Sequence, residues 1–229
     1  MGGQACVLYG AAEYSRDLDL AVLATSDAFP KLRRALDELS ATVIAVPSFE
    51  MAYLERGHAV HFNVPDGANA AFRVDIMSRM RNVDSFPLLW ERRTTVMLPD
   101  ATGNEHSVHL LSLEDLVAAK KTQRDKDWPM LRRLVDASYV AARDDAVSNE
   151  RVSFWLSELR SPEFLIEVAA RFPDAAQVAT RPAVVEVLRG GDVRGALNAE
   201  QQHELSVDRE YWAPLRRELE WLRHAQRKG

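Results

Sequence analysis

The stretch Asp17-Leu18-Asp19-Leu20 is separated from Gly2-Gly3 by thirteen residues and decides the fold. The alternation of acidic and apolar residues predicts a strand with both aspartates on one face and both leucines on the other. Two carboxylates at this spacing repel each other unless a cation lies between them, and Mg²⁺ commonly binds one or two carboxylates together with substrate phosphates. Asp17 and Asp19 are therefore candidate metal ligands; the alternative is an edge strand whose charges are solvated.

The glycine pair precedes a segment rich in alanine, Gln4 to Tyr14, which is predicted to be a helix. Glycine lets the backbone approach a phosphate without a Cβ between them, and free N–H groups at the start of a helix bind phosphate oxygens. Gly2 and Gly3 are therefore candidate nucleotide-binding residues, as is the pair Ser15-Arg16, which directly precedes the first aspartate.

A third carboxylate, Asp75, lies in the segment Phe72-Arg73-Val74-Asp75-Ile76-Met77, which is predicted to be a strand. If this strand neighbours the strand of Asp17, three carboxylates meet on one face. A phosphoryl-transfer site with one or two metal ions requires that arrangement, with one carboxylate that helps to activate the attacking hydroxyl. The alternative for Asp75 is an ion pair with a neighbour such as Arg73.

The glycine pair, the predicted helix, the Asp-Leu-Asp-Leu strand and the later strand aspartate together resemble the polymerase-β-type nucleotidyltransferase superfamily. A second stretch, Leu111 to Leu116 followed by Lys120 to Asp127, is similar to the helical part of AbiEii-like and related bacterial nucleotidyltransferases. By motif the resemblance covers roughly residues 2–78, and with the second stretch it reaches about residue 140.

The resemblance implies a nucleotidyltransferase-type mixed sheet with flanking helices and transfer of a nucleoside monophosphate from an NTP, such as ATP, to a hydroxyl of RNA (tRNA-like) or of a protein. It implies Mg²⁺, or Mn²⁺, bound by Asp17, Asp19 and Asp75, with Asp75 also helping to deprotonate the acceptor. The phosphates are assigned to Gly2 and Gly3. The AbiEii likeness adds a toxin–antitoxin or phage-defence setting with a cognate partner.

Two features depart from the family pattern. The family places a strand just before the glycines, whereas this chain starts at them, and many members carry serine at the position of Gly3. Both departures argue against efficient catalysis more than against the fold. The missing strand supports an alternative function, a catalytically weak or inactive module of the same fold that binds a nucleotide or a partner, whereas retention of all three aspartates argues against that alternative. A third alternative is an interaction protein that acts through its helical tail.

A basic cluster follows the predicted strands. A helix is predicted from Ser112 to about Arg124, in which Lys120, Lys121 and Arg124 continue the apolar stripe by steps of three and four. Basic groups that extend a buried face tend to point into a cleft, where lysine and arginine bind phosphates. Lys121 and Arg124 are therefore candidate nucleotide-binding residues; the alternative is pairing with the acidic residues that follow, of which Asp127 is a candidate N-cap of the next helix.

The remaining pattern predicts an α+β (α/β-like) fold in which strands alternate with helices in residues 1–145 and a helical C-terminal region occupies residues 146–229. Strands are predicted at residues 17–24, 42–46, 58–64, 71–77, 94–98 and 107–111. Helices are predicted at residues 30–39, 49–56, from 127, 149–160, 162–171, 181–189 and 208–226.

Composition limits the class of protein. The 229 residues are 47% hydrophobic and 28% charged, which excludes wholesale disorder. No apolar run reaches the roughly 20 residues that a membrane helix needs, so no membrane association is expected. The net charge of -5 argues against a broad nucleic-acid surface. The only cysteine, Cys6, cannot form an internal disulfide, which is typical of the reducing cytoplasm.

Overall fold

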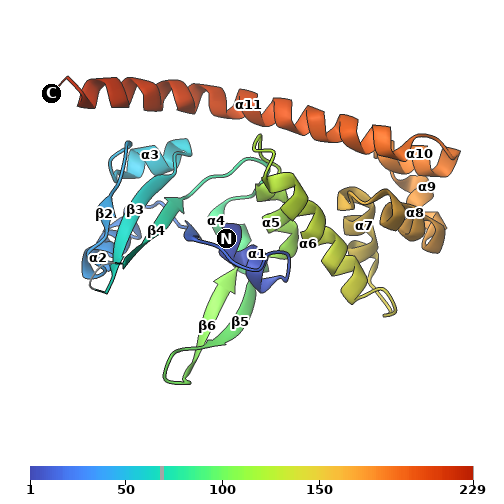
Figure 1. Ribbon diagram of the computed structural model, residues 1–229, viewed down its shortest axis with the longest axis horizontal. Helices are drawn as coiled ribbons and strands as arrows, with labels where there is room; N and C mark the ends of the chain where they lie inside the picture. Colours follow the sequence, from blue (N-terminus) through green and yellow to red (C-terminus); the bar gives the residue numbers. More distant parts are fainter. Residues whose placement is uncertain (68–69, 229) are drawn as a thin grey trace. The chain divides into compact units, whose positions relative to one another are not determined.

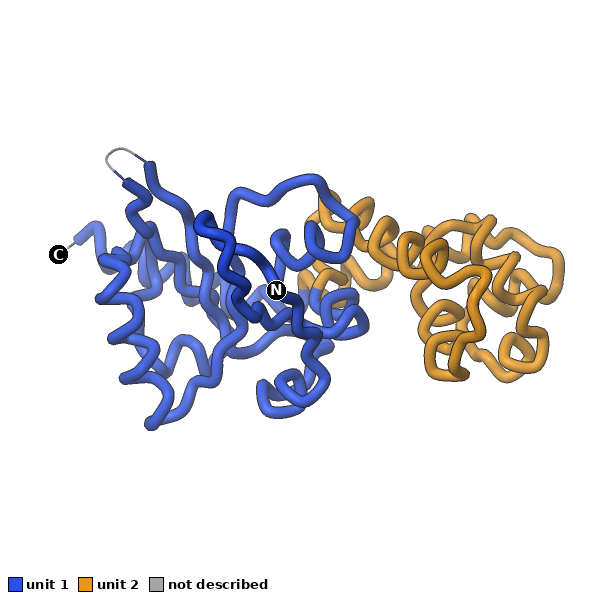
Figure 2. The backbone as a smooth tube through the Cα atoms, turned by 90° about the horizontal axis from the view of Figure 1, so that it is seen from below, with its two compact units in different colours: residues 1–119, 210–229 blue, residues 120–209 orange. Residues whose placement is uncertain are grey.

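The computed structural model describes residues 1–67 and 70–228 and divides the chain into two compact units (Figures 1 and 2). Unit 1 comprises residues 1–119 and 210–229, and unit 2 comprises residues 120–209. The predicted mixed α+β fold with a helical C-terminal region is confirmed. The predicted boundary after residue 145 lies inside unit 2, between two of its helices.

Unit 1 contains a four-stranded mixed sheet in the order β1-β4-β3-β2. Strand β1 pairs in parallel with β4, whereas β4 with β3 and β3 with β2 are antiparallel. The strands are β1 (Asp17–Ala21), β2 (Thr42–Val43), β3 (Val60–Asp66) and β4 (Ala70–Met77). The two aspartates of β1 therefore lie beside β4, the strand that carries Asp75.

One face of this sheet is apolar and forms the core of unit 1. Helices α2 (Phe29–Glu38) and α3 (Met51–Arg56) contribute Leu36 and Leu54 to it. Gly57 ends α3 in the left-handed conformation, with φ of 99°, which glycine adopts at no steric cost. The buried members of the core are Leu36, Phe49, Leu54, Val60, Phe62, Val64, Val74 and Ile76.

Unit 1 also contains elements outside this sheet. They are α1 (Gly2–Leu8), α4 (Phe86–Arg92), the antiparallel hairpin of β5 (Thr94–Pro99) and β6 (Glu105–Leu110), α5 (Leu113–Lys120) up to residue 119, and α11 (Val193–Gln226) from residue 210. The hydroxyl of Tyr9, just after α1, donates toward Thr94 at 2.8 Å and the carbonyl of Leu111 at 2.9 Å. Buried His58 lies 2.7 Å from Glu218 of α11.

Unit 2 is helical. It contains α6 (Asp127–Ala141), α7 (Asn149–Glu158), α8 (Pro162–Arg171), α9 (Pro173–Val178), α10 (Pro182–Arg189) and the first part of α11. Proline opens α8, α9 and α10, where its missing N–H has no helical acceptor in any case. The buried rings of Tyr139 and Trp155 lie 5.1 Å apart in the core.

Several predicted helix ends are wrong. The helix predicted to reach Tyr14 ends at Leu8, because Gly10 takes a φ of +76° and the chain turns back there. The helix predicted to reach Arg124 ends at Lys120, because Asp127 accepts hydrogen bonds from Thr122 and Arg124 and so holds the segment as a turn. Asp127 is the first residue of α6, not its N-cap.

The sequence pattern also missed or misjudged other elements. Helices α4 and α9 were not predicted, and α11 starts fifteen residues earlier than the predicted helix at 208–226. Residues 193–207 are rich in alanine, leucine, glutamate and glutamine, which are strong helix formers. Strand β2 is limited to two residues; Pro47, four residues later, has no N–H for a ladder hydrogen bond.

A search for membrane-spanning elements covers residues 1–67 and 70–228. Within these ranges no helix combines the length and the apolar character that crossing a bilayer requires.

We expect Ile76→Ala to destabilise unit 1 by about 2–5 kcal/mol, because it deletes a fully buried side chain from the central strand β4. Ile44→Ala is the matched control, since Ile44 is 53% exposed and its truncation should cost no more than about 0.5 kcal/mol. Urea-dependent hydrogen exchange of peptides from β3 and β4 measures the two changes for unit 1 by itself. Equal costs at both positions would contradict the packing described here.

Candidate functional site

The face of the sheet opposite the core carries polar side chains from three adjacent strands. In the parallel pairing of β1 with β4, Asp17 lies opposite Arg73 and Asp19 lies opposite Asp75. In the antiparallel pairing of β4 with β3, Asp75 lies opposite His61. Since paired residues of neighbouring strands share a face, the three predicted carboxylates are on one face together with a guanidinium and an imidazole.

Asp75 is held by two neighbours on this face. Arg73 donates from Nε to Oδ1 at 2.6 Å and from Nη2 to Oδ2 at 2.8 Å, a bidentate geometry that is strong and specific. Nδ1 of His61 lies 2.8 Å from Oδ1 of Asp75 and 2.9 Å from Nη2 of Arg73. The carboxylate is only 13% exposed, so both of its oxygens are engaged away from bulk water.

The contacts of Asp75 set its ionisation. Burial by itself would raise the pKa of Asp75, but its hydrogen bonds and electrostatic interactions with His61 and Arg73 lower it below the ordinary value. In turn, the hydrogen bond to Asp75 raises the pKa of Arg73, to which the charges of Asp17 and Asp19 add. The face thus combines three acidic side chains with one fixed cation among them.

The glycine pair packs against Asp19 of β1 and against Ser15, which precedes the strand. A Cβ on Gly2, whose φ is +65°, would lie 1.8 Å from Oδ2 of Asp19, and a Cβ on Gly3 would lie 2.3 Å from Oγ of Ser15. The N–H of Gly3 donates to Oδ2 of Asp19 at 3.3 Å. Both glycines are therefore needed because the backbone of α1 approaches the start of β1 too closely for a side chain.

Ser15 and Arg16 lie at the entry to β1. The hydroxyl of Ser15 donates to the carbonyl of Asp17 at 3.1 Å, and the Ser15 carbonyl accepts from the side chain of Gln4 at 3.0 Å. Arg16 is exposed and hydrogen-bonds the hydroxyl of Tyr14, the contact that chiefly raises the pKa of Arg16. Ser15 is thus part of the local fold, whereas Arg16 is a cation at the rim of the acidic face.

The donor set suits Mg²⁺ in part. Asp17 and Asp19 offer hard carboxylate oxygens, and Mg²⁺ usually takes one or two of these and fills its other positions with water and phosphate. Asp75 offers the same chemistry, but Arg73 engages both of its oxygens. Across residues 1–67 and 70–228, no three His, Cys, Asp or Glu side chains are grouped so that they could jointly hold a metal ion.

The two remaining predicted nucleotide ligands lie in unit 2. Lys121 donates to Glu158 at 2.6 Å, and both side chains are largely buried. Arg124 pairs with buried Asp127 at 2.7 Å. Because α5 ends at Lys120, these cations do not continue its apolar stripe, and that argument for a phosphate cleft is wrong.

Sequence analysis underestimated two residues of the acidic face. Arg73 entered only as the ion-pair alternative for Asp75, and His61 was not selected. Both could have been found from the period-two pattern, because Arg73 shares the strand face of Asp75 and His61 shares the face of Asn63 on the preceding strand of the same hairpin. Which residues of β3 and β4 stand opposite each other depends on the turn between them.

Comparison with known proteins adds no assignment. No protein-family model matches the chain, and no curated protein matches it significantly.

We expect Gly2→Ala to destabilise unit 1 more than Gly10→Ala. Both positions have a positive φ, of 65° and 76°, so both changes should cost about 1–2 kcal/mol for the backbone conformation. Only Gly2 adds a clash with Asp19, since nothing lies within 4 Å of a Cβ on Gly10, and we expect a further cost of about 1–3 kcal/mol. Urea-dependent hydrogen exchange of β1 peptides provides the measurement. The close approach of α1 to β1 is refuted if the two variants lose equal stability.

We expect the stability that Asp75 contributes to depend on pH. Because the folded-state pKa lies below the ordinary value of about 3.9, ionised Asp75 stabilises the fold above about pH 4, and this contribution is lost as the pH falls through the folded-state pKa. Asp75→Asn should therefore cost about 1–2 kcal/mol at pH 7 and much less at about pH 3. The exposed Asp66 at the end of β3 provides the control, Asp66→Asn, measured by denaturation at both pH values. A cost for Asp75→Asn that does not change with pH would contradict the ion pair.

Proposed function

We propose that this protein is an Mg²⁺-dependent nucleotidyltransferase, which moves a nucleoside monophosphate from an NTP to a hydroxyl group. The observation that carries the proposal is the register of β1 and β4, which brings Asp17, Asp19 and Asp75 onto one face beside the glycine pair. The three carboxylates come from two adjacent parallel strands, and the backbone of the two glycines lies beside one of them. This arrangement suits a site for a charged phosphate chain and its metal ion.

Within this proposal Asp17 and Asp19 hold Mg²⁺, or Mn²⁺ in place of Mg²⁺. When bound, the metal would neutralise charge on the triphosphate and favour departure of pyrophosphate. The side chain of Asp19 is oriented for this role by the N–H of Gly3, and Gly2 leaves the space that the carboxylate occupies. Arg16, exposed beside Asp17, supplies a positive charge at the rim where phosphates would enter.

The reaction forms a bond from the acceptor oxygen to the α-phosphorus and breaks the bond from that phosphorus to the pyrophosphate oxygen. The hydroxyl proton must pass to a base. Asp75 is assigned this role by its place on the face, but its lowered pKa makes it a weaker base while Arg73 and His61 hold it. The adjacent imidazole of His61 is the second group on this face that can take the proton.

The acceptor and the setting come from the resemblance alone. It suggests an RNA hydroxyl, as at a tRNA end, or a protein hydroxyl, and a toxin–antitoxin or phage-defence role with a cognate partner. The single, buried Cys6 supports a reducing, cytoplasmic location. Lys121 and Arg124 stay predicted phosphate ligands, with carboxylate partners inside unit 2.

A second candidate function is a module of the same fold that binds a nucleotide or a partner without efficient catalysis. The bidentate contact of Arg73 with Asp75 favours it, because the guanidinium supplies internally the positive charge that a metal ion would otherwise provide. Efficient metal-dependent catalysis at Asp75 then requires Arg73 to release that carboxylate.

A transfer assay tests the proposed function. The protein is incubated with Mg²⁺ and each of four α-labelled NTPs, with total tRNA in one arm and lysate protein in the other. We expect label to enter one acceptor, and Asp17→Asn or Asp19→Asn to reduce incorporation by at least about a hundredfold, because each removes a charged metal ligand. Asp37→Asn, on the outer part of α2, is the matched control and should leave incorporation unchanged.

Binding measurements distinguish the two candidate functions. Titration with Mn²⁺, followed by electron paramagnetic resonance in the presence of an NTP, reports metal binding without turnover. Binding that depends on Asp17 and Asp19, without transfer to either acceptor, supports the non-catalytic module. Absence of both transfer and metal-dependent NTP binding contradicts the transferase and a module that binds a nucleotide, and leaves only a module that binds a partner.

A further inference from the structure

The acidic face of unit 1 can be compared with sites that use one or two metal ions. A two-metal site holds its ions about 3.5–4 Å apart, one beside the attacking oxygen and one beside the leaving oxygen. If Asp17 and Asp19 hold one ion, a second ion needs Asp75, the third carboxylate on this face. The contacts of Asp75 therefore determine how many ions the face can bind.

Both oxygens of Asp75 are held by the guanidinium of Arg73. Nε donates to Oδ1 at 2.6 Å, and Nη2 donates to Oδ2 at 2.8 Å. A metal ion bound to either oxygen at about 2.1 Å would lie within about 5 Å of this guanidinium, and two cations so close repel each other. The carboxylate is only 13% exposed, which leaves little room for the water ligands that Mg²⁺ usually keeps.

The guanidinium is also in contact with a third strand. Nη2 of Arg73 lies 2.9 Å from Nδ1 of His61 on β3, and the same nitrogen of His61 lies 2.8 Å from Oδ1 of Asp75. The charges of Asp17 and Asp19 further favour the charged form of Arg73. Release of Arg73 would break its contacts with Asp75 and His61 and leave a largely buried carboxylate without its cation, which is costly.

Arg73 keeps donors for a ligand. Within residues 1–67 and 70–228 its hydrogen bonds use Nε and Nη2, so the two N–H groups of Nη1 stay available. The side chain is 43% exposed, so a ligand on the face can reach it. Guanidinium groups bind phosphate oxygens, and like metal ions they stabilise the negative charge on a transferred phosphoryl group.

We propose that the acidic face binds a single metal ion, at Asp17 and Asp19, and that Arg73 takes the place of a second ion and binds a phosphate oxygen of the NTP through Nη1. Asp75 then positions Arg73 and is not a metal ligand. This inference rests on the proposed nucleotidyl transfer. It makes metal binding compatible with the closed ion pair, because Arg73 does not have to leave Asp75.

A count of bound Mn²⁺ tests the inference without turnover. The full chain is equilibrated with Mn²⁺ and inorganic tripolyphosphate, the chain of three phosphates that every NTP carries, and native mass spectrometry counts the ions in the complex. Electron paramagnetic resonance shows whether two ions lie close enough for their spins to couple. We expect one uncoupled Mn²⁺ in the unmodified chain and also in Asp75→Asn, and none in Asp17→Asn.

Removal of the guanidinium should create the second metal position. We expect Arg73→Gln to bind two spin-coupled Mn²⁺ ions, because Asp75 is then free to act as a ligand. The double variant Arg73→Gln with Asp75→Asn should bind one ion again. Arg34→Gln removes an exposed arginine from α2 and is the matched control, which should bind one ion. Circular dichroism reports whether each variant folds, and the count for the unmodified chain does not depend on any variant.

A second comparison tests the phosphate contact of Arg73. Asp75→Asn keeps Arg73 and the double variant lacks it, and each is expected to hold one Mn²⁺. At a fixed Mn²⁺ concentration, we expect the double variant to bind tripolyphosphate at least about tenfold more weakly, because it has lost a charged donor to phosphate. Isothermal titration calorimetry measures the two affinities.

The outcomes separate this inference from the proposed function. Two Mn²⁺ ions in the unmodified chain, one ion in folded Arg73→Gln, loss of Mn²⁺ in Asp75→Asn, or equal tripolyphosphate affinities in the last comparison would each overturn the inference and leave the proposed transfer standing. If neither the unmodified chain nor any variant binds Mn²⁺, the proposed transfer itself is contradicted, and the inference with it.

Discussion

The parallel pairing of β1 with β4 is the constraint on which the candidate site depends. It aligns Asp19 with Asp75 and Asp17 with Arg73, so that three acidic side chains and one guanidinium share a face. The same pairing turns Leu18, Leu20, Val74 and Ile76 to the opposite face, where they form the core. A shift of one residue would exchange the two faces. The register that packs the core therefore also determines which side chains lie on the polar face. A change that shifts this register would affect both the stability of unit 1 and its candidate site.

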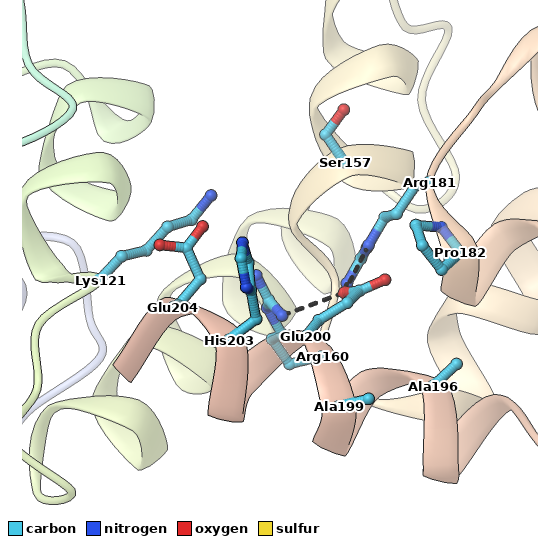
Figure 3. A pocket seen from close by; sticks show the side chains of 10 residues that line it. All are labelled: Lys121, Ser157, Arg160, Arg181, Pro182, Ala196, Ala199, Glu200, His203 and Glu204. Carbon is cyan, nitrogen blue, oxygen red and sulfur yellow. Dashed lines mark hydrogen bonds and ion pairs between the residues drawn. The ribbon is translucent and has the colours of Figure 1, made fainter. Parts of the chain in front are cut away.

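In both units, arginine side chains pair with buried carboxylates. On the sheet of unit 1, Arg73 binds both oxygens of Asp75, and His61 completes the contacts of that carboxylate. In unit 2, Arg160 and Arg181 converge on Glu200 (Figure 3), and Glu158 lies 3.9 Å from Arg160 and 2.6 Å from Lys121. In both units the positive charges that hold buried carboxylates therefore come from the chain itself.

Much of the fold could be predicted from local pattern. Local pattern located every strand that the structure describes, although β2 is shorter than predicted. Helix ends were less predictable, because they depend on backbone conformation at Gly10 and on the side-chain contacts of Asp127. The length of α11 was underestimated, since helix formers with no strong apolar stripe give a weak signal over residues 193–207.

The sequence by itself determined that Asp17 and Asp19 share a face, because side chains alternate along any strand. It also indicated that another group can approach the backbone closely at Gly2 and Gly3, because glycine has no Cβ. Only the tertiary structure decided that Asp75 stands beside Asp19, that Arg73 and His61 hold it, and that two arginines of unit 2 share Glu200. These contacts join residues far apart in the chain, so they follow from strand register and helix packing, which local periodicity does not encode.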